Sequence, residues 1–317
     1  MASFIVKKTS KSKFTMNSEF QNFPLTFVNG LRRICLSEIP TVVVTNIEVL
    51  KNTTQMPHEM LIHRMSLLPI NVMHTETNII RDAKIELRQL PDPDNNHELT
   101  TDDFVIHSGR EHLLMKDRDL GTPLLFIRVR KGEEIHIKGD LAVELGSQVC
   151  TVSTKFHIDP ERAEVDKKSF IEGGGDERVF DNFQIQRSYS VDERGRPNWI
   201  DMYIESVGVL ESKHILKLAV EKLRSEVDSW VKNAKIARES EPNVYSVSLD
   251  QGGHTVGALL QEVIYHTAES AVVSYDIPHP LKNTMVIRFL TENKPEDVIK
   301  NAHKTIHDYC EIVENGL

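Results

Sequence analysis

Two histidines four positions apart have the spacing that most directly suggests chemistry. His303 and His307 lie in a segment of helical periodicity, and side chains at i and i+4 share one face of a helix, as in a metal-binding pair. The segment HKTIH lacks the glutamate of a hydrolytic HExxH motif, and no third carboxylate is evident beside it. We therefore interpret both histidines as solvated and predict no metal and no cofactor.

Other catalytic patterns are absent from the sequence. The glycines at 173–175 are not followed by the Lys-Ser or Lys-Thr of a phosphate-binding loop, so we expect a flexible connection there. The sequence has no GxSxG motif and no CxxC pair. Cys35, Cys150 and Cys310 are odd in number and widely spaced, as is typical of free thiols in a reducing compartment. We predict a non-catalytic chain.

The charge balance argues against direct binding of nucleic acid. The sequence has 38 basic and 47 acidic residues and a net charge of -9, whereas affinity for phosphates comes from clustered Lys and Arg. Any DNA or RNA is therefore expected to be held by a partner. The apolar runs are shorter than the roughly 20 residues that span a bilayer, and no signal-peptide apolar region is evident. We expect a soluble intracellular protein with no membrane contact.

Hydrophobic periodicity predicts the main elements. Apolar residues recur at helical spacing in three segments, and a β-branched run predicts a strand at 41–49. A unit built mainly of strands is expected over 52–155, with a short helix at 59–67. The predicted long elements are helices at 23–36, 212–231 and 295–313, and the predicted hairpin elements are 79–87 and 124–130.

The chain resembles itself when it is shifted by 229 positions. This shift pairs Thr26 with Thr255 and Leu31 with Leu260, and it also pairs the valines at 43–44 with those at 272–273. Each copy would be a helix and then a strand, closed later by a long amphipathic helix. Two such units favour a pseudo-symmetric pair that packs helix on helix. The alternative is chance, because short helix-strand patterns recur widely.

These patterns predict an α+β fold in several segments. Residues 1–14 are expected to form a polar, partly ordered leader, 159–177 a charged break, and 236–243 a linker. Further strands are expected at 183–191, 199–207, 244–249, 271–277 and 284–290. The predicted domains are a first dimerisation domain at 1–50 and 178–235, a mainly β insert domain at 51–177, and a second dimerisation domain at 244–317.

An ordered series of motifs carries a family resemblance. The series consists of NGLRR at 29–33, SEIPT at 37–41, HR at 63–64, LPI at 68–70, KGE at 131–133 and IESVG at 204–208. Residues 15–230 resemble the family of the third-largest subunit of eukaryotic RNA polymerase II, the archaeal D subunit and the bacterial alpha amino-terminal domain. The segment at 144–155 departs from the family pattern. The cysteines that bind zinc or iron-sulfur clusters in some members are absent.

The C-terminal part resembles a second subunit. GHTVG at 253–257, YDIPHPL at 275–281, Arg288, Thr291 and Pro295 are similar to the eleventh subunit of RNA polymerase II and the archaeal L subunit. The resemblance implies that two alpha-subunit-like dimerisation units pack as an intramolecular pseudo-heterodimer, the first carrying the β insert. It implies a fused gene, as in large DNA viruses that bring their own polymerase.

The resemblance also implies two sets of site residues. Docking of the large catalytic subunits would use polar side chains, with the outward-facing Arg32 and Arg33 contacting the second-largest subunit; the alternative for these two is a merely solvated pair. A local salt link from Glu59 to the neighbouring His63 and Arg64 is the alternative for those residues. The docking set is Arg32, Arg33, Glu38, Glu59, His63 and Arg64. The internal pseudo-dimer interface would contain Phe27, Leu31, Ile34, Leu223, Val227, Leu260, Val263, Ile264, Ile306, Tyr309 and Val313.

The expected function is that of an assembly scaffold of a multisubunit DNA-dependent RNA polymerase. Its partners would be the largest and second-largest subunits and small polymerase subunits, with no homo-oligomer required. A viral protein would act in the virion and host cytoplasm, and a cellular one in the nucleus. The alternative is a regulator that borrowed the fold to bind a polymerase surface.

Overall fold

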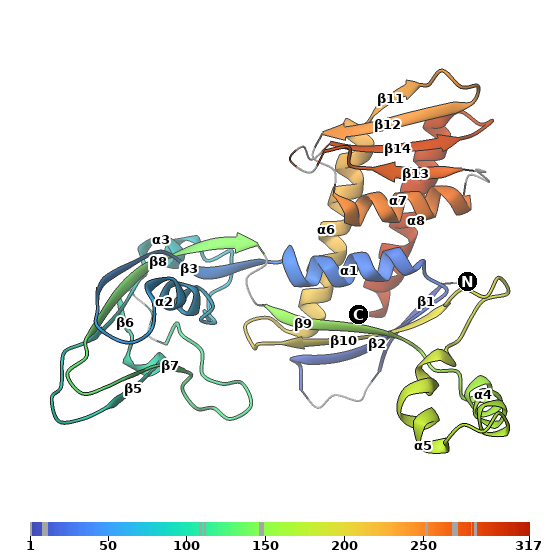
Figure 1. Ribbon diagram of the computed structural model, residues 1–317. Coiled ribbons are helices and arrows are strands. Elements are labelled where there is room, and N and C mark those ends of the chain that lie inside the picture. Colours follow the sequence, from blue (N-terminus) through green and yellow to red (C-terminus); the bar gives the residue numbers. More distant parts are fainter. Residues whose placement is uncertain are drawn as a thin grey trace. The chain divides into compact units, whose positions relative to one another are not determined.

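The computed structural model describes residues 2–7, 12–107, 110, 112–145, 149–250, 253–267, 272–279, 281 and 284–317. The chain divides into two units (Figure 1). Unit 1 contains Met1–Cys35, Val152–Ile204 and Ser212–Leu317, and unit 2 contains Leu36–Thr151 and Glu205–Glu211. Both units combine helices with sheets, so the predicted α+β class is confirmed.

The described residues of unit 1 form two four-stranded sheets with matching strand orders. The first runs β1-β2-β10-β9 and the second β11-β12-β14-β13. In chain order, each sheet has two strands before a shorter helix and two strands after it. The strands of the first sheet are Ser3–Lys7, Thr15–Gln21, Cys150–Phe156 (β9) and Trp199–Ser206 (β10), and those of the second are Lys235–Arg238, Val244–Asp250, Val273–Asp276 (β13) and Thr284–Leu290 (β14).

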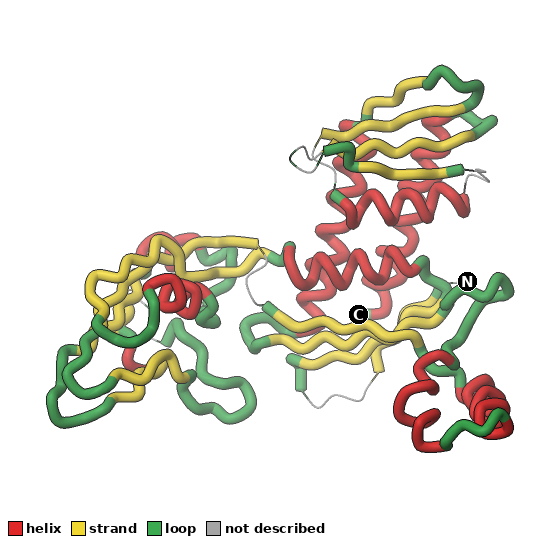
Figure 2. Tube along the Cα trace, viewed as in Figure 1, coloured by secondary structure: helices red, strands yellow, loops and turns green. Residues whose placement is uncertain are grey.

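Four of the described helices of unit 1 follow the same repeat, and the helices within residues 152–204 lie outside it. The shorter helices are α1 (Leu25–Ser37) and α7 (His254–Thr267), and the long ones are α6 (Ser212–Asn233) and α8 (Pro295–Gly316). We call the first sheet with α1 and α6 the first half, and the second sheet with α7 and α8 the second half. Figure 2 shows these helices between the two sheets. The fold of unit 1 is therefore built twice from one plan.

Apolar spacing explains why the long helices form and pack. In α6, side chains three or four positions apart are buried, among them Ala219, Leu223 and Val227. In α8 the buried positions include Ala302 and Ile306. An isolated helix gains little stability in water, so burial of this stripe supplies most of it.

Unit 2 has a four-stranded sheet of order β3-β8-β4-β6 and a two-stranded sheet of β5 and β7. Strands β3 and β8 are antiparallel, and the core under them contains Leu61, Met65, Ile85 and Ile137. The bounds are β3 Pro40–Asn52, α2 His58–Ser66, α3 Thr77–Asp82, β4 Lys84–Gln89, β5 His97–Thr100, η1 Thr101–Asp103, β6 Val105–His107, β7 Leu125–Val129 and β8 Ile135–Leu145.

Three segments that were expected to be irregular or extended differ in the structure. The break at 159–177 contains helix α4 (Pro160–Glu172), which Asp159 caps by accepting hydrogen bonds from the amides of Glu161 and Arg162. The strand expected at 183–191 begins instead in helical turns, namely α5 (Glu177–Val179), η2 (Phe180–Gln184) and η3 (Ile185–Arg187). The first part of the element expected at 79–87 is helix α3.

Strand pairing also changes the expected boundaries. The leader contributes β1, which pairs antiparallel with β2, and the linker region contributes β11, which pairs with β12. Unit 2 spans Leu36–Thr151 where the insert was expected at 51–177. Strand β3 therefore belongs to unit 2, and the strand order makes β9 the counterpart of β13. The match of the valines at 43–44 with 272–273 does not reflect equivalent strands.

Candidate subunit-pairing interface

Helix α1 is capped by a carboxylate from the other half. Oε2 of Glu262, on α7, lies 3.2 Å from the backbone nitrogen of Thr26 and 2.5 Å from its Oγ1. Amides in the first turn of a helix have no partner within the helix, and the N-terminal end of the helix dipole favours negative charge. Glu262 therefore satisfies donors of α1 that would otherwise need water.

A second contact runs in the opposite direction. Nε of Arg33, on α1, donates to Oγ1 of Thr255 in the first turn of α7, at 3.0 Å. Thr255 follows Thr26 by 229 positions, and Glu262 follows Arg33 by the same number. The two contacts thus exchange under the internal repeat, which is the pattern of an isologous interface. The helices approach closely here, since a Cβ on Gly30 would lie 3.4 Å from Cγ2 of Thr255.

Aromatic side chains join the two halves at a second place. The ring of Tyr309, on α8, lies 5.3 Å from that of Phe23 and 5.5 Å from that of Phe27. Phe27 is fully buried, and burial raises the pKa of the Tyr309 phenol above its ordinary value. Tilted aromatic pairs at such separations add to the free energy gained from area burial alone.

The long helices α6 and α8 are joined by polar contacts as well. Nη2 of Arg224 donates to Oε2 of Glu314 at 2.7 Å, and this hydrogen bond raises the pKa of Arg224. His303 and His307 both approach Asp228 of α6. The two halves are therefore linked by apolar packing and by charged groups.

The structure places all eleven side chains expected at the internal interface in unit 1. Ten are buried and Tyr309 is half-buried. The expected set omits Thr26, Glu262, Thr255 and Asp228, which are polar. The shift of 229 positions pairs Thr26 with Thr255, so the repeat in the sequence contained a signal for the contact between α1 and α7.

The six expected docking residues fall in both units. Arg32 and Arg33 are on α1 in unit 1, and Nε of Arg32 donates to Oδ1 of Asn29 at 3.0 Å. In unit 2, Glu38 precedes β3, and Glu59, His63 and Arg64 are exposed on α2. Arg64 bonds to a backbone carbonyl of unit 2, that of Leu125, at 3.1 Å.

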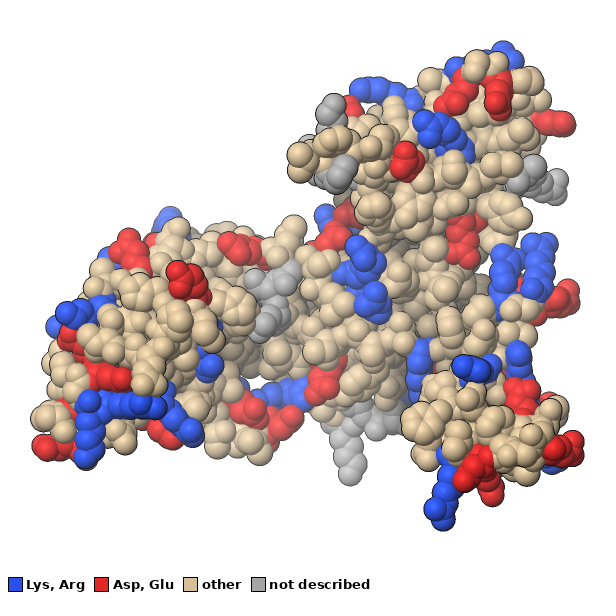
Figure 3. Space-filling model, viewed as in Figure 1, with Lys and Arg blue, Asp and Glu red and all other residues tan. Residues whose placement is uncertain are grey.

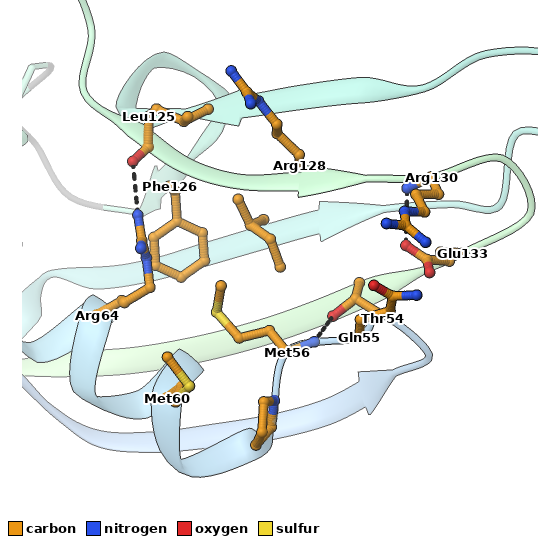
Figure 4. A pocket seen from close by; sticks show the side chains of 12 residues that line it. Thr54, Gln55, Met56, Met60, Arg64, Leu125, Phe126, Arg128, Arg130 and Glu133 are labelled. Carbon is orange, nitrogen blue, oxygen red and sulfur yellow. Dashed lines mark hydrogen bonds between the residues drawn. The ribbon is translucent and has the colours of Figure 1, made fainter.

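A groove lies beside Arg64 in unit 2 (Figure 4). It has a volume of about 520 Å³ and lies between α2 and β7. Met60 is 53% exposed and Leu125 42% exposed, so apolar surface is available at the groove. Figure 4 shows Arg64 at one end, bonded to Leu125, and Arg130 and Glu133 at the other. The groove offers apolar contacts between charged ends.

Two matches to one family cover most of the chain. The RNA polymerase Rpb3/Rpb11 dimerisation domain matches residues 4–227 and, in a second form, residues 245–316. The chain belongs to the Rpb3/Rpb11 dimerisation family. It contains two domains of that family in tandem, which confirms the resemblance expected from the motifs. The two matches correspond to the first and second halves, with unit 2 inside the first match.

Named relatives agree with this family. The chain is 26% identical to the RNA polymerase II subunit RPB3 of Schizosaccharomyces pombe over 175 residues, which is 47% of this chain and 58% of the relative. It is 26% identical to the RNA polymerase subunit Rpo3 of Methanosphaera stadtmanae over 140 residues, which is 39% of this chain and 48% of the relative. A conjugation stage-specific protein of Tetrahymena thermophila is 24% identical over 193 residues, which is 48% of this chain and 59% of the relative. The chain thus spans about half the length of these relatives.

The face of the molecule drawn in Figure 3 is mixed in charge. On the face drawn in Figure 3, Lys and Arg atoms alternate with Asp and Glu atoms. Within the part of the chain that the structure describes, no helix has the length and apolar character of a membrane span.

Proposed function

We propose that this chain is a non-catalytic assembly subunit of a multisubunit DNA-dependent RNA polymerase. Its two halves form a built-in heterodimer, and the large catalytic subunits assemble on it. The observation that carries this proposal is the exchanged pair of contacts, Thr26 with Glu262 and Arg33 with Thr255, between α1 and α7. One chain thereby forms the type of pair for which its family is named.

Covalent linkage of the halves has an energetic consequence. A partner on the same chain is present at an effective concentration of about the mM range for a short flexible connection. The connection here is short, because α6 ends at Asn233 and β11 begins at Lys235. The halves therefore pair in a one-to-one ratio without a dimerisation step that depends on concentration.

The proposed docking surface of unit 1 is the outer side of α1. Arg32 and Arg33 follow Leu31, which is fully buried, and Arg32 is part-exposed while Arg33 is exposed. Because Nε of Arg33 donates to Thr255 of α7, Arg32 is the arginine of this pair that is left to lead the docking surface. Guanidinium groups donate several hydrogen bonds in a fixed fork, which suits carboxylates and carbonyls of a protein partner. We assign this surface to the second-largest subunit.

The proposed docking surface of unit 2 is α2 together with the groove beside it. Glu59, His63 and Arg64 lie on α2, and Met60 lines the groove. Protein interfaces commonly have an apolar centre, in which Met and Arg are enriched, and a polar rim. We assign the groove to an apolar segment of a large polymerase subunit.

Affinity purification of the full chain from its native cells tests the assembly role. We expect two large polymerase subunits in stoichiometric amounts, identified by mass spectrometry. Recovery in substoichiometric amounts, or with a polymerase that already holds another D-like and L-like pair, would instead show the regulator that borrowed the fold. Recovery without any polymerase subunit would reject both roles.

Charge reversal tests the docking surfaces. Arg32→Glu and Arg64→Glu should each reduce capture of a large subunit, since arginine is enriched among the interface residues whose loss costs about 2 kcal/mol or more. Lys168→Glu is the matched control, because Lys168 is exposed on α4. Equal capture by all three variants would remove these residues from the docking surface.

A further inference from the structure

Three side chains with metal-binding chemistry converge where α6 and α8 run side by side. Nε2 of His303 and Nε2 of His307 each lie 2.7 Å from Oδ1 of Asp228. The three potential ligand atoms lie within 4.8 Å of one another, and the two imidazole rings are 4.1 Å apart between centroids. The sequence places no carboxylate beside HKTIH that could be a third ligand. In the fold, α6 supplies this carboxylate from Asp228.

The surroundings of these side chains suit a bound ion. The side chains of His303 and His307 are 30% and 29% exposed and that of Asp228 is 51% exposed, so solvent and ions reach them. The positive charge of Arg224, one turn earlier on α6, is paired with the carboxylate of Glu314.

A second group of possible ligands in unit 1 differs in one respect. Glu19, His157 and Asp201 also bring their ligand atoms within 4.8 Å of one another. There, however, the ammonium of Lys7 pairs with Glu19, and that of Lys155 lies 3.9 Å from Asp201. Because lysines already balance those carboxylates, this group is a weaker candidate.

We propose that Asp228, His303 and His307 bind one divalent transition-metal ion of the Zn²⁺ type. Imidazole nitrogens and a carboxylate oxygen are common ligands of Zn²⁺, which often has three protein ligands and one water. Ligand atoms around a tetrahedral Zn²⁺ lie about 3.3 Å apart, given bonds of about 2.0–2.1 Å. The side chains would therefore need to move only slightly apart from their present Nε2–Oδ1 distances of 2.7 Å to admit the ion.

The ion would join the two halves. Asp228 belongs to α6 of the first half, and both histidines belong to α8 of the second. Only the folded chain brings all three ligands together, so the metal stabilises the folded state by an amount that grows with the logarithm of the free metal concentration above the Kd. The site does not depend on binding to a polymerase.

A titration with Co²⁺ as the probe tests the site. The full chain, stripped of metal with a chelator, is titrated at pH 7.5 while visible absorption reports coordination, and Zn²⁺ is then added as competitor. We expect one equivalent of Co²⁺ to bind and Zn²⁺ to displace it. We also expect Zn²⁺ to raise the Tm of the chain.

Variants assign the ligands. Asp228→Asn and the double variant His303→Gln/His307→Gln should bind at least about 10–100-fold more weakly, since changes even to groups behind the ligands have effects of this size. His58→Gln, an exposed histidine on α2, is the matched control and should bind as the unmodified chain does. Circular dichroism without metal identifies any variant that fails to fold.

Three results would overturn the proposal. They are no binding at micromolar metal, binding that the variants leave unchanged, and a thiolate-to-cobalt absorption band, which would place the metal on cysteine. A chain that captures the large polymerase subunits but binds no metal would reject this site alone.

Discussion

The two halves of unit 1 share one plan but differ in what is inserted into it. The second half passes from α7 to β13 and β14 and ends with α8. In the first half, unit 2 lies between α1 and β9, and α4 to η3 lie between β9 and β10. The elements common to both halves are a four-stranded sheet, a shorter helix and a long helix, and the helices of one half pack on those of the other. The insertions enter only at connections, so they add surface to the first half without changing the strand order.

The helix ends at the interface also differ between the halves. A carboxylate, Glu262, meets the first turn of α1, and a guanidinium, Arg33, meets the first turn of α7. The dipole of a helix favours the first arrangement and disfavours the second. Equivalent positions in a symmetric fold thus carry opposite charges, and the contribution of each contact to stability should differ.

The largest effect is expected for the leucines that the repeat makes equivalent. Leu31→Ala and Leu260→Ala should each lower the free energy of unfolding by about 2–5 kcal/mol, because both side chains are fully buried and truncation leaves a cavity. Urea unfolding of the full chain measures this. Leu281→Ala is the control, with a side chain 89% exposed and an expected change within about 0.5 kcal/mol.

Similar losses at the two leucines would support equivalent roles in one interface. A loss below about 1 kcal/mol at both, outside the range usual for buried leucines, would contradict the packing of α1 and α7 described here.

A smaller effect is expected for the two exchanged polar contacts, and it should be unequal. Glu262→Ala removes a charged acceptor from two part-buried donors and should destabilise the chain by about 1–2 kcal/mol. Arg33→Ala removes its exposed hydrogen bond to Thr255, and loss of this bond should cost about 0.5 kcal/mol. Urea unfolding again reports both values, and a greater loss for Arg33→Ala would reverse the interpretation of the helix ends.

The smallest perturbation uses a native cysteine as a probe. Cys310, on α8, is fully buried, and burial raises the pKa of its thiol to about 12. At pH 8 only about one thiol in 10⁴ would be ionised, so modification should be slow until the chain unfolds. Labelling with a thiol reagent followed by peptide mass mapping measures the rate at Cys310.

That rate reports on the pairing of the halves. Leu260→Ala should accelerate labelling of Cys310, because a less stable interface opens more often. Modification of the unmodified chain at the rate of a free peptide would show that α8 is not buried as described.

Periodicity predicted the helices with an apolar stripe and missed elements without one. Helices α1, α6 and α8 lie close to their expected ranges, since a buried face imposes regular spacing. In α4 only Ala163 is buried, and all four residues of β11 are exposed. Such elements are held by caps and strand pairing, which leave no hydrophobic pattern in the sequence.

The polar contacts between helices were harder to predict than the buried positions. Asp228 meets His303 and His307 from 75 and 79 positions away, through the packing of α6 on α8. No local spacing encodes such a contact. Thr26 and Thr255 are different, because their equivalence under the repeat was visible in the sequence.

The pairing of Phe27 with Tyr309 has a consequence for synthesis of the chain. A ribosome makes Phe27 first and must add more than 280 residues before its aromatic partner exists. At about 5–20 residues per second, that interval is about 14–56 s. The side of α1 that meets Tyr309 therefore emerges well before its partner, and Phe27 lacks this aromatic contact until α8 has been made.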